Sequence, residues 1–385
     1  MKIKDVDKAV ARIKEAVKNN EKIVIYGDAD VDGVSSVIIM EETIKAIGGK
    51  VERSYFPDYE KQRHGVNEVA LNILKPLAPA LLITVDLGIS NNQEIEIAKE
   101  MGFDVVIIDH HDIIDKIPEA TAVVDPKRED DNYPFKFFAA AGLVLRVAED
   151  LIDDMSKSLR EDLVSLAAVA TITDMMPQED ENLEIIEEGL KYLDYNERPG
   201  IKVFFQSKKL GEGLSSQEVV SKISTLTNVR NIEGDYPAAY LMLSYKTMRE
   251  AEEFLDELIE KNELRQNRIN EGVAMLEEKL LNNPTEEIIF EGHSSWDSSI
   301  LSSIASRISA KFLKPAFLFP LGEDEIRGTM RCPRGINGME ALKSCDNLLI
   351  MYGGHPPAGG YRIKKENLSK FKECLTNYFL SIKIK

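Results

Sequence analysis

The chain has 385 residues, of which 43 % are hydrophobic, and this size predicts two or three domains rather than a single core. It carries 48 basic and 66 acidic residues, a net charge of −18, so a uniformly acidic surface would repel nucleic acid. A nucleic-acid partner therefore requires a local basic surface. Residues 285–385, with 14 Lys and Arg against 11 Asp and Glu, are the least acidic part of the chain.

Membrane and secretory signals are missing from the sequence. No segment contains the roughly 18 apolar residues that a membrane-spanning helix needs, and the N-terminus has no signal-peptide core. We therefore expect no membrane partner and a cytoplasmic location. The cysteines, Cys332, Cys345 and Cys374, are odd in number and form no CxxC pair. They favour a reducing compartment and argue against both a disulfide framework and a zinc knuckle.

The first part of the chain alternates between apolar runs typical of strands and segments with helical periodicity. The strand-like runs lie at residues 22–26, 51–55, 80–85, 104–108 and 120–124, and the helix-like segments between them at 34–47, 67–74 and 91–101. Strands that alternate with helices at this spacing predict βαβ units and a parallel sheet. Further helices are predicted at residues 137–152, 159–172 and 183–193.

A long helix is predicted at residues 247–281, because apolar positions recur there at helical spacing among many charges. The Asn-Asn-Pro at residues 282–284 ends it. A mixed pattern follows, with strand-like runs at 287–290 and 316–319 and helices at 298–311 and 367–380. We therefore expect an α/β protein. Its predicted parts are a parallel-sheet domain at 1–195, a helical region with the long connecting helix at 196–284, and a smaller mixed-sheet α/β domain at 285–385.

Three carboxylates follow the first strand-like run. Asp28, Asp30 and Asp32 stand at alternate positions, and the apolar segment after Gly33 is typical of a helix. Open α/β sheets bind their ligands at the carboxyl ends of strands. Carboxylates crowded there repel one another unless a divalent cation is present, which favours a metal site. The alternative is an Asx-rich turn that caps the helix.

Further candidate ligands end the later strand-like runs. Asp86 follows the third run, with a helix cap as the alternative. Asp109-His110-His111-Asp112 follows the fourth, and adjacent histidines flanked by aspartates fit a metal ligand supported by a neighbouring carboxylate. Asp174 stands where an apolar helix stops, and by itself it is typical of a surface residue at a helix end.

Two segments near the C-terminus have features of phosphate-binding sites. Gly353-Gly354-His355 opens a stretch rich in Gly and Pro, where the backbone can approach phosphate oxygens and His355 could contact a phosphate or the metal site. An ordinary tight loop is the alternative. Thr329 and Arg331 alternate on a strand-like run, so both would project from one face as phosphate-binding groups, unless that face is simply solvated.

These motifs, in this order, resemble the DHH phosphoesterase superfamily over nearly the whole chain. Asp109-His110-His111 is the motif that names the superfamily, and Gly353-Gly354-His355 resembles the signature of its C-terminal DHHA1 domain. Within the superfamily the chain is most similar to the RecJ branch of single-strand-specific exonucleases. The further matching segments lie at residues 26–33, 83–90, 124–127, 173–177, 181–182 and 305–307.

The resemblance implies a site with two divalent cations, Mn²⁺ or Mg²⁺, in a DHH domain at residues 1–195. The implied metal ligands are Asp28, Asp30, Asp32, Asp86, His110 and Asp174, with Asp86 bridging the two ions. His111, facing the scissile phosphate, and Asp109 are the implied catalytic residues. The implied substrate-binding residues are Arg63, Asn228, Arg327, Thr329, Arg331, Gly353, Gly354 and His355.

The implied activity is hydrolysis of single-stranded DNA to 5′-mononucleotides, 5′→3′, by two-metal-activated water in DNA repair or recombination. A replication or repair protein is a possible partner suggested by the resemblance. Two other functions stay open. One is an enzyme acting on short RNA or as a 3′-phosphoadenosine nucleotide phosphatase, and the other is a non-catalytic replication or repair scaffold.

The chain departs from the RecJ pattern at several positions. RecJ proteins carry Pro-x-x-Asn-Ala-x-Gly-Arg where this chain has residues 223–230, which keep Asn228 but lack the Gly-Arg. Trp296-Asp297 stands in place of Trp-His, and Arg63-His64-Gly65-Val66 in place of a Gly-Tyr-Gly loop. In RecJ proteins an oligonucleotide-binding domain follows the DHHA1 domain; we expect this chain to lack it and to bind its substrate more weakly unless a partner compensates.

Overall fold

The computed structural model describes residues 2–58, 62, 64–228, 236–282, 287–322 and 324–383. Its internal contacts divide the chain into two compact units, Met1–Leu258 and Ile259–Lys385. The predicted domain boundaries at residues 195/196 and 284/285 stay predictions. Within the described residues, no helix is both long and apolar enough to cross a membrane.

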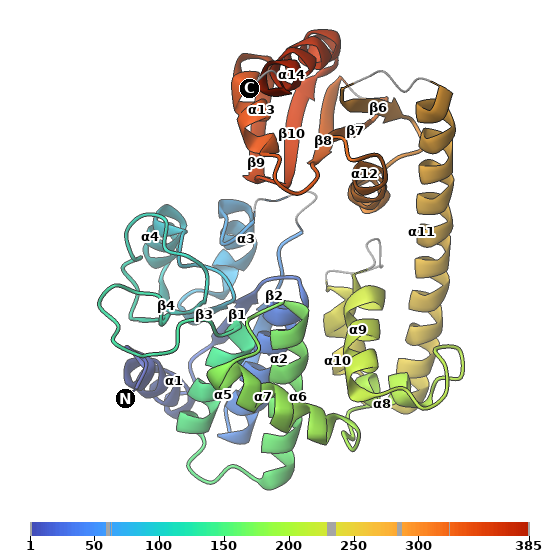
Figure 1. The fold of residues 1–385 in the computed structure, drawn as a ribbon. Helices are drawn as coiled ribbons and strands as arrows, with labels where there is room; N and C mark the ends of the chain where they lie inside the picture. Colours follow the sequence, from blue (N-terminus) through green and yellow to red (C-terminus); the bar gives the residue numbers. More distant parts are fainter. Residues whose placement is uncertain are drawn as a thin grey trace. The chain divides into compact units, whose positions relative to one another are not determined.

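The described part of the first unit is built on a five-stranded parallel sheet in the order β2-β1-β3-β4-β5, which confirms the predicted parallel sheet (Figure 1). The strands are β1 (Ile23–Gly27), β2 (Val51–Tyr55), β3 (Ala80–Val85), β4 (Phe103–Ile108) and β5 (Ala122–Val124). In this order the connection from β2 passes over β1 to reach β3. The switch of direction therefore falls between β1 and β3, the place where doubly wound sheets bind ligands.

Helices cover both faces of this sheet, which explains why β1 and β3 are apolar and buried along their whole length. On one face, α3 and α4 pack on alternate strand residues such as Val24, Leu82 and Val105. Figure 1 shows α2 and α5 on the other side of the sheet. The helices of this part are α1 (Val6–Lys18), α2 (Val31–Ala46), α3 (Glu68–Leu74), α4 (Asn92–Glu100), α5 (Ala140–Leu151), α6 (Lys157–Thr173) and α7 (Asp180–Leu193).

Shorter helices lead to the long one. They are α8 (Pro199–Gln206), α9 (Ser216–Thr227) and α10 (Ala238–Ser244), followed by α11 (Met248–Asn282). The 35 residues of α11 confirm the long helix predicted at residues 247–281. The division between the two units falls within α11.

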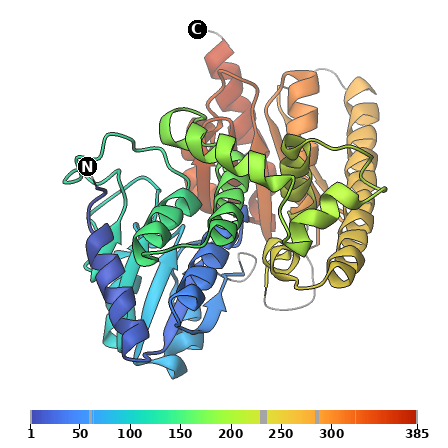
Figure 2. The same cartoon turned by 90° about the horizontal axis from the view of Figure 1, so that it is seen from below.

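The second unit contains a five-stranded mixed sheet in the order β6-β7-β8-β10-β9 within the described residues, as predicted. β6 and β7 are parallel and the other pairs are antiparallel. Helix α12 packs on one face and α13 and α14 on the other, and Figure 2 shows these elements from a second side. The bounds are β6 (Ile289–His293), α12 (Ser298–Phe312), β7 (Ala316–Pro320), β8 (Glu325–Arg331), α13 (Gly338–Ser344), β9 (Leu349–His355), β10 (Ala358–Lys364) and α14 (Leu368–Lys383).

The Gly-Pro stretch, for which a tight loop was the alternative to a phosphate-binding segment, forms a hairpin in which Gly353, Gly354 and His355 end β9 and pair with β10. One expectation for the second unit is wrong. Cys345 and Cys374 form a disulfide, whereas the sequence argued against one. α13 and α14 pack on the same face of the sheet and bring the two Cα atoms within 6.1 Å, a proximity that residue spacing alone does not reveal.

Candidate metal centre

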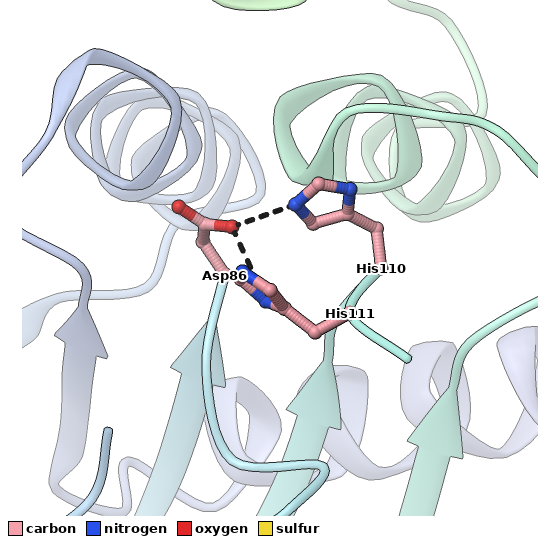
Figure 3. Close-up of side chains that lie close together, drawn as sticks. All are labelled: Asp86, His110 and His111. Atoms are coloured by element: carbon pink, nitrogen blue, oxygen red, sulfur yellow. Dashed lines mark ion pairs between the residues drawn. The ribbon is translucent and has the colours of Figure 1, made fainter. Parts of the chain in front are cut away.

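Asp86 is one of the buried carboxylates of the candidate centre. It follows β3 directly and is 2 % exposed. Its N–H donates to the Ile108 carbonyl at 3.0 Å, and its φ of 63° is uncommon for a residue with a side chain. Figure 3 shows its carboxylate pointing toward the rings of His110 and His111, with Oδ1 3.2 Å from His110 Nε2 and 3.9 Å from His111 Nδ1.

Ligand-capable atoms from four segments meet at the ring of His110. Its Nε2 lies 3.2 Å from Asp86 Oδ1, 3.7 Å from Asp174 Oδ2 and 3.8 Å from Asp32 Oδ2. Asp86 and His110 follow β3 and β4, Asp32 lies in the first turn of α2, and Asp174 caps the C-terminus of α6. The sheet and two helices thus bring together residues that are 142 positions apart in sequence, between Asp32 and Asp174.

The donor set fits a divalent cation. Asp86 Oδ1 and Asp174 Oδ2 are buried and have no hydrogen-bond partner among the described residues. Burial first, and then the charges of neighbouring aspartates, raise the pKa of Asp32 and of Asp86 well above the ordinary value, and that of Asp174 to about 6. Carboxylates that repel one another in this way are stabilised by a hard cation.

His110 has the protonation state that a metal ligand requires. Burial, followed by the charge of His111, lowers the pKa of His110 to about 4, so the ring is neutral at neutral pH. A neutral imidazole can use its Nε2 lone pair for a cation. The ligand-capable atoms of Asp32, His110 and Asp174 form one group that could hold an ion, and those of Asp86, His110 and His111 form another.

Asp109 orients both histidines. Its Oδ1 accepts hydrogen bonds from the backbone N–H groups of His110 and His111 and from His111 Nδ1 at 2.8 Å, while its Oδ2 accepts from the Ile89 N–H at 2.9 Å. Burial would raise the pKa of Asp109, but the hydrogen bond and charge of His111 outweigh it and lower the pKa below the ordinary value. Asp109 therefore acts as a fixed anion that is hydrogen-bonded to the backbone of both histidines and to the ring of His111.

His111 is a cation at the edge of the centre. The hydrogen bond to Asp109 outweighs burial and raises the pKa of His111 to about 9. Its side chain is 55 % exposed, in contrast to the 6 % of His110. A protonated, exposed imidazole beside buried carboxylates can donate to a phosphate oxygen.

The carboxylates after β1 have different surroundings. Asp30 caps α2, because its Oδ1 accepts from the N–H groups of Asp32 and Gly33 at 2.9 and 3.0 Å. Asp32 accepts from the N–H groups of Ala140 and Ala141 at 2.7 and 2.8 Å, at the N-terminus of α5. The hydrogen bonds of Asp30 are therefore those expected for a residue that caps a helix. Its charge and that of Asp28 nevertheless reach the centre, since both raise the pKa of Asp86.

The predicted substrate-binding residues of the second unit lie on β8 and β9. Thr329 and Arg331 project from one face of β8, with Arg331 Nη1 donating to Thr329 Oγ1 at 3.0 Å. Gly353, Gly354 and His355 are exposed at the end of β9. Arg327 lies on β8 opposite Arg362. In the first unit, Asn228 ends α9, and Arg63 lies outside the described residues.

Two serine residues that were not among the predicted site residues also contact this strand face. Ser302 Oγ lies 3.2 Å from Thr329 Oγ1, and Arg331 Nε donates to Ser306 Oγ at 3.2 Å. Both serines are on α12 and are separated by four residues, so they share one side of the helix. The spacing of four positions within a predicted helix was the sequence signal that could have identified these two serines. Asp125 was also missed as a site residue, although it is fully buried near Asp109 and burial raises its pKa to about 7.

Comparison with known proteins shows which family model and which solved structures the chain resembles. Residues 22–171 match the family model described as DHH family, N-terminal domain. Over 381 residues the chain is 34 % identical to the single-stranded-DNA-specific exonuclease RecJ of Bacillus subtilis, with 97 % of this chain and 47 % of the relative covered. The chain thus spans about half the length of that relative.

The fold is similar to solved RecJ structures. The match to the crystal structure of exonuclease RecJ bound to manganese has a TM-score of 0.83 at 26 % identity and covers 99 % of this chain and 95 % of that one. The match to RecJ from Thermus thermophilus in complex with Mn²⁺ has a TM-score of 0.80 at 26 % identity, with 99 % and 55 % covered.

Proposed function

Because the chain belongs to the DHH family, we propose that it is a metal-dependent exonuclease that hydrolyses single-stranded DNA to 5′-mononucleotides in the 5′→3′ direction. The observation that carries the proposal is the convergence of Asp32, Asp86 and Asp174 on His110 Nε2, with buried carboxylate oxygens that lack hydrogen bonds. The substrate and the product follow from the similarity to RecJ exonucleases. A role in DNA repair or recombination, in the cytoplasm and with a replication or repair protein as partner, completes the proposal.

The residues that would hold two ions of Mn²⁺ or Mg²⁺ are Asp28, Asp30, Asp32, Asp86, His110 and Asp174. When bound, the ions would activate water and neutralise charge on the phosphate in an in-line displacement. RecJ structures contain Mn²⁺, which supports the choice of metal. Asp86, whose Oδ1 lies nearer to His110 Nε2 than the carboxylate oxygens of Asp32 and Asp174, would be a ligand in this centre.

The other residues of the centre would bind and orient the substrate. His111, protonated and held by Asp109, donates a hydrogen bond to an oxygen of the scissile phosphate. The charge of Asp109 keeps that proton on His111 while the phosphate gains negative charge. In the second unit, Thr329, Arg331 and the end of β9 would bind phosphates of the strand, with Ser302 and Ser306 supporting Thr329 and Arg331.

The proposal is tested with end-labelled single-stranded DNA, duplex DNA, RNA and very short oligonucleotides, each incubated with Mn²⁺. We expect the wild type to degrade single-stranded DNA from its 5′ end and Asp86→Ala to be inactive. Asp153→Ala, which changes an exposed carboxylate elsewhere in the first unit, is the matched control and keeps full activity.

Different failures lead to different conclusions. Cleavage confined to short RNA or nucleotides contradicts the DNA exonuclease and favours the oligonuclease or phosphatase. If no substrate is cleaved in a metal-dependent way, the non-catalytic replication or repair scaffold is the function that remains. Full activity in Asp86→Ala refutes the assignment of the centre.

A further inference from the structure

An aromatic ladder, made of Phe56, Tyr240 and Tyr236, lies where β2 ends and α10 begins. The rings of Tyr236 and Tyr240 are stacked, with centroids 5.0 Å apart and planes at 24°. Phe56 contacts Tyr240 at a centroid distance of 5.0 Å and forms a T-shaped pair with Tyr236 at a centroid distance of 6.3 Å. The ladder runs from the interior to the surface, since Phe56 is 5 % and Tyr236 39 % exposed.

The ladder lies at the sheet edge that carries the metal centre. β2 is the neighbour of β1, as Figure 1 shows, and Tyr55 pairs with Tyr26. Phe56 is therefore level with Gly27, the residue before Asp28. Neighbouring strands are about 4.8 Å apart, so the inner end of the ladder is about one strand spacing from the loop that carries the aspartates.

Hydrogen bonds fix the middle ring of the ladder. The Tyr240 hydroxyl donates to Glu41 Oε1 at 2.9 Å, and the Ser54 hydroxyl donates to the same oxygen. Glu41 lies on α2 and Ser54 on β2, so Tyr240 is tied to both layers of the domain. Tyr236 thus stacks on a ring whose position is fixed by the hydrogen bond of Tyr240 to Glu41. Packing of α10 explains why Phe56 and Tyr240 are aromatic, but it does not require an exposed ring at position 236.

We propose that Tyr236 stacks on a nucleobase of the single-stranded substrate, next to the phosphate that enters the metal centre. This inference rests on the proposed function and adds the subsite that binds the base. Every base has a π-face, so a stacking site accepts any sequence, as an exonuclease that degrades whole strands requires. Bases in a duplex already stack on their neighbours, and only an unpaired base is free to occupy the ladder. Tyr236 therefore contributes to selection of single strands.

The test measures binding and cleavage separately. Dissociation constants for single-stranded oligonucleotides are measured in EDTA, by fluorescence anisotropy, for the wild type, Tyr236→Phe and Tyr236→Leu. Phe keeps the ring and Leu keeps an apolar contact with Tyr240 without it. We expect Tyr236→Phe to bind like the wild type and Tyr236→Leu to bind about 5- to 100-fold more weakly. Tyr195→Leu, at a tyrosine that is 80 % exposed after α7, is the control and binds like the wild type.

A second arm removes the base instead of the ring. A single abasic nucleotide is placed at successive positions from the end of the strand. We expect one position to weaken binding by the wild type and to have no effect on Tyr236→Leu, because the two changes remove the same contact. Equal binding of the intact strand by the wild type and Tyr236→Leu overturns the inference, as does an unchanged sensitivity of this variant to the abasic position. Failure of the wild type to bind single strands overturns it too.

Cleavage in Mn²⁺ distinguishes the two proposals. If both hold, Tyr236→Leu raises KM for single strands and leaves kcat within about twofold of the wild-type value. A wild type that binds strands with the expected dependence on ring and base but cleaves none refutes the proposed function and not the base subsite. Cleavage with the same KM in all three proteins refutes the subsite and not the proposed function.

Discussion

At the scale of single residues, two adjacent histidines differ in charge because their surroundings differ. Burial, followed by the charge of His111, lowers the pKa of His110 to about 4, whereas the hydrogen bond from His111 to Asp109 raises the pKa of His111 to about 9. One ring is therefore neutral and suited to a metal ion, and the other is protonated and suited to a phosphate. The Asp109-His110-His111 motif therefore contains a candidate metal ligand and a candidate phosphate donor. The hydrogen bond to Asp109 is what raises the pKa of His111.

This division of roles predicts the effect of changing His111. His111→Gln keeps a side chain that can donate a hydrogen bond but has no charge, so kcat on single-stranded DNA should fall about 10²-fold while the affinity for Mn²⁺ is kept. His110→Gln should instead weaken Mn²⁺ binding by at least about 10-fold, because even loss of a residue that only supports a metal ligand costs about 10- to 100-fold. Metal titration and steady-state kinetics check both variants. Equal loss of Mn²⁺ affinity in the two variants would make His111 a ligand and contradict the assignment.

At the scale of elements, an ion-pair cluster ties α1 to the sheet. Arg12 on α1 donates to Glu21 at 2.6 Å and to Asp104 of β4 at 2.5 Å, and Thr121 also donates to Asp104. The hydrogen bond from Arg12 lowers the pKa of Glu21, and for Asp104 these bonds outweigh burial and lower the pKa as well. The helix is thus attached most firmly when both carboxyl groups are ionised.

The cluster predicts how stability depends on pH. Carboxyl groups with a lowered folded-state pKa stabilise the protein above their unfolded pKa of about 4, and this stability is lost as the pH falls through the folded pKa. The difference in unfolding free energy between the wild type and Arg12→Gln should therefore shrink as the pH falls from 6 to 3. Denaturant unfolding at several pH values measures it. A difference that grows toward low pH would contradict the role of the cluster.

The disulfide between α13 and α14 predicts a redox-dependent stability of the second unit. A link between cysteines 29 residues apart contributes about 3–4 kcal/mol by the chain-entropy model. Cys374→Ser should melt at a lower temperature than the wild type, and reductant should lower the wild-type melting temperature without affecting Cys374→Ser. Cys332→Ser, at the free cysteine, serves as the control. A wild-type melting temperature that is insensitive to reductant would refute the bond.

At the scale of the whole molecule, charge is distributed unevenly over an acidic chain. The net charge is −18, yet the last hundred residues or so hold more basic than acidic side chains. A protein of this charge binds a polyanion only through local basic groups, which release counterions from the strand. Arg331, on the strand face shared with Thr329, is one of the basic groups we assign to a phosphate.

Salt dependence tests that assignment. Each phosphate contact with a single strand contributes about 0.7 to the slope of log affinity against log salt. Arg331→Gln should therefore weaken binding and reduce the slope by about 0.7, while Lys343→Gln, at an exposed position on α13, should change neither. Binding measured at several salt concentrations gives the slope. An unchanged slope in Arg331→Gln would remove this residue from the interface.

Local patterns were sufficient to predict the architecture. The apolar runs of β1, β3 and β4 are buried on both faces, so they stand out in the sequence, and the polar residues that end them share one sheet edge. Asp86 and His110 could therefore be placed together before any coordinates. The long helix and the mixed sheet after it also follow from local patterns, whereas the division of the chain into three domains stays a prediction.

Contacts between distant segments could not be predicted. Asp32 hydrogen-bonds α5, which lies 108 residues further along the chain, and no local pattern connects the two. The bond between Cys345 and Cys374 depends on how two helices pack, and the stacking of Tyr236 on Tyr240 depends on where α10 meets β2. Asp30 was ambiguous for another reason, since one short side chain can cap a helix or bind a cation.

The central claim is that Asp86 and His110 belong to a metal centre that hydrolyses single-stranded DNA. The most direct measurement is a Mn²⁺ titration in which bound metal, by electron paramagnetic resonance, and strand cleavage are followed in the same sample. We predict that the wild type and Asp153→Ala bind two ions and cleave in proportion to occupancy, while Asp86→Ala loses bound Mn²⁺ and cleavage together. Cleavage without metal, or wild-type Mn²⁺ binding in Asp86→Ala, would contradict the account.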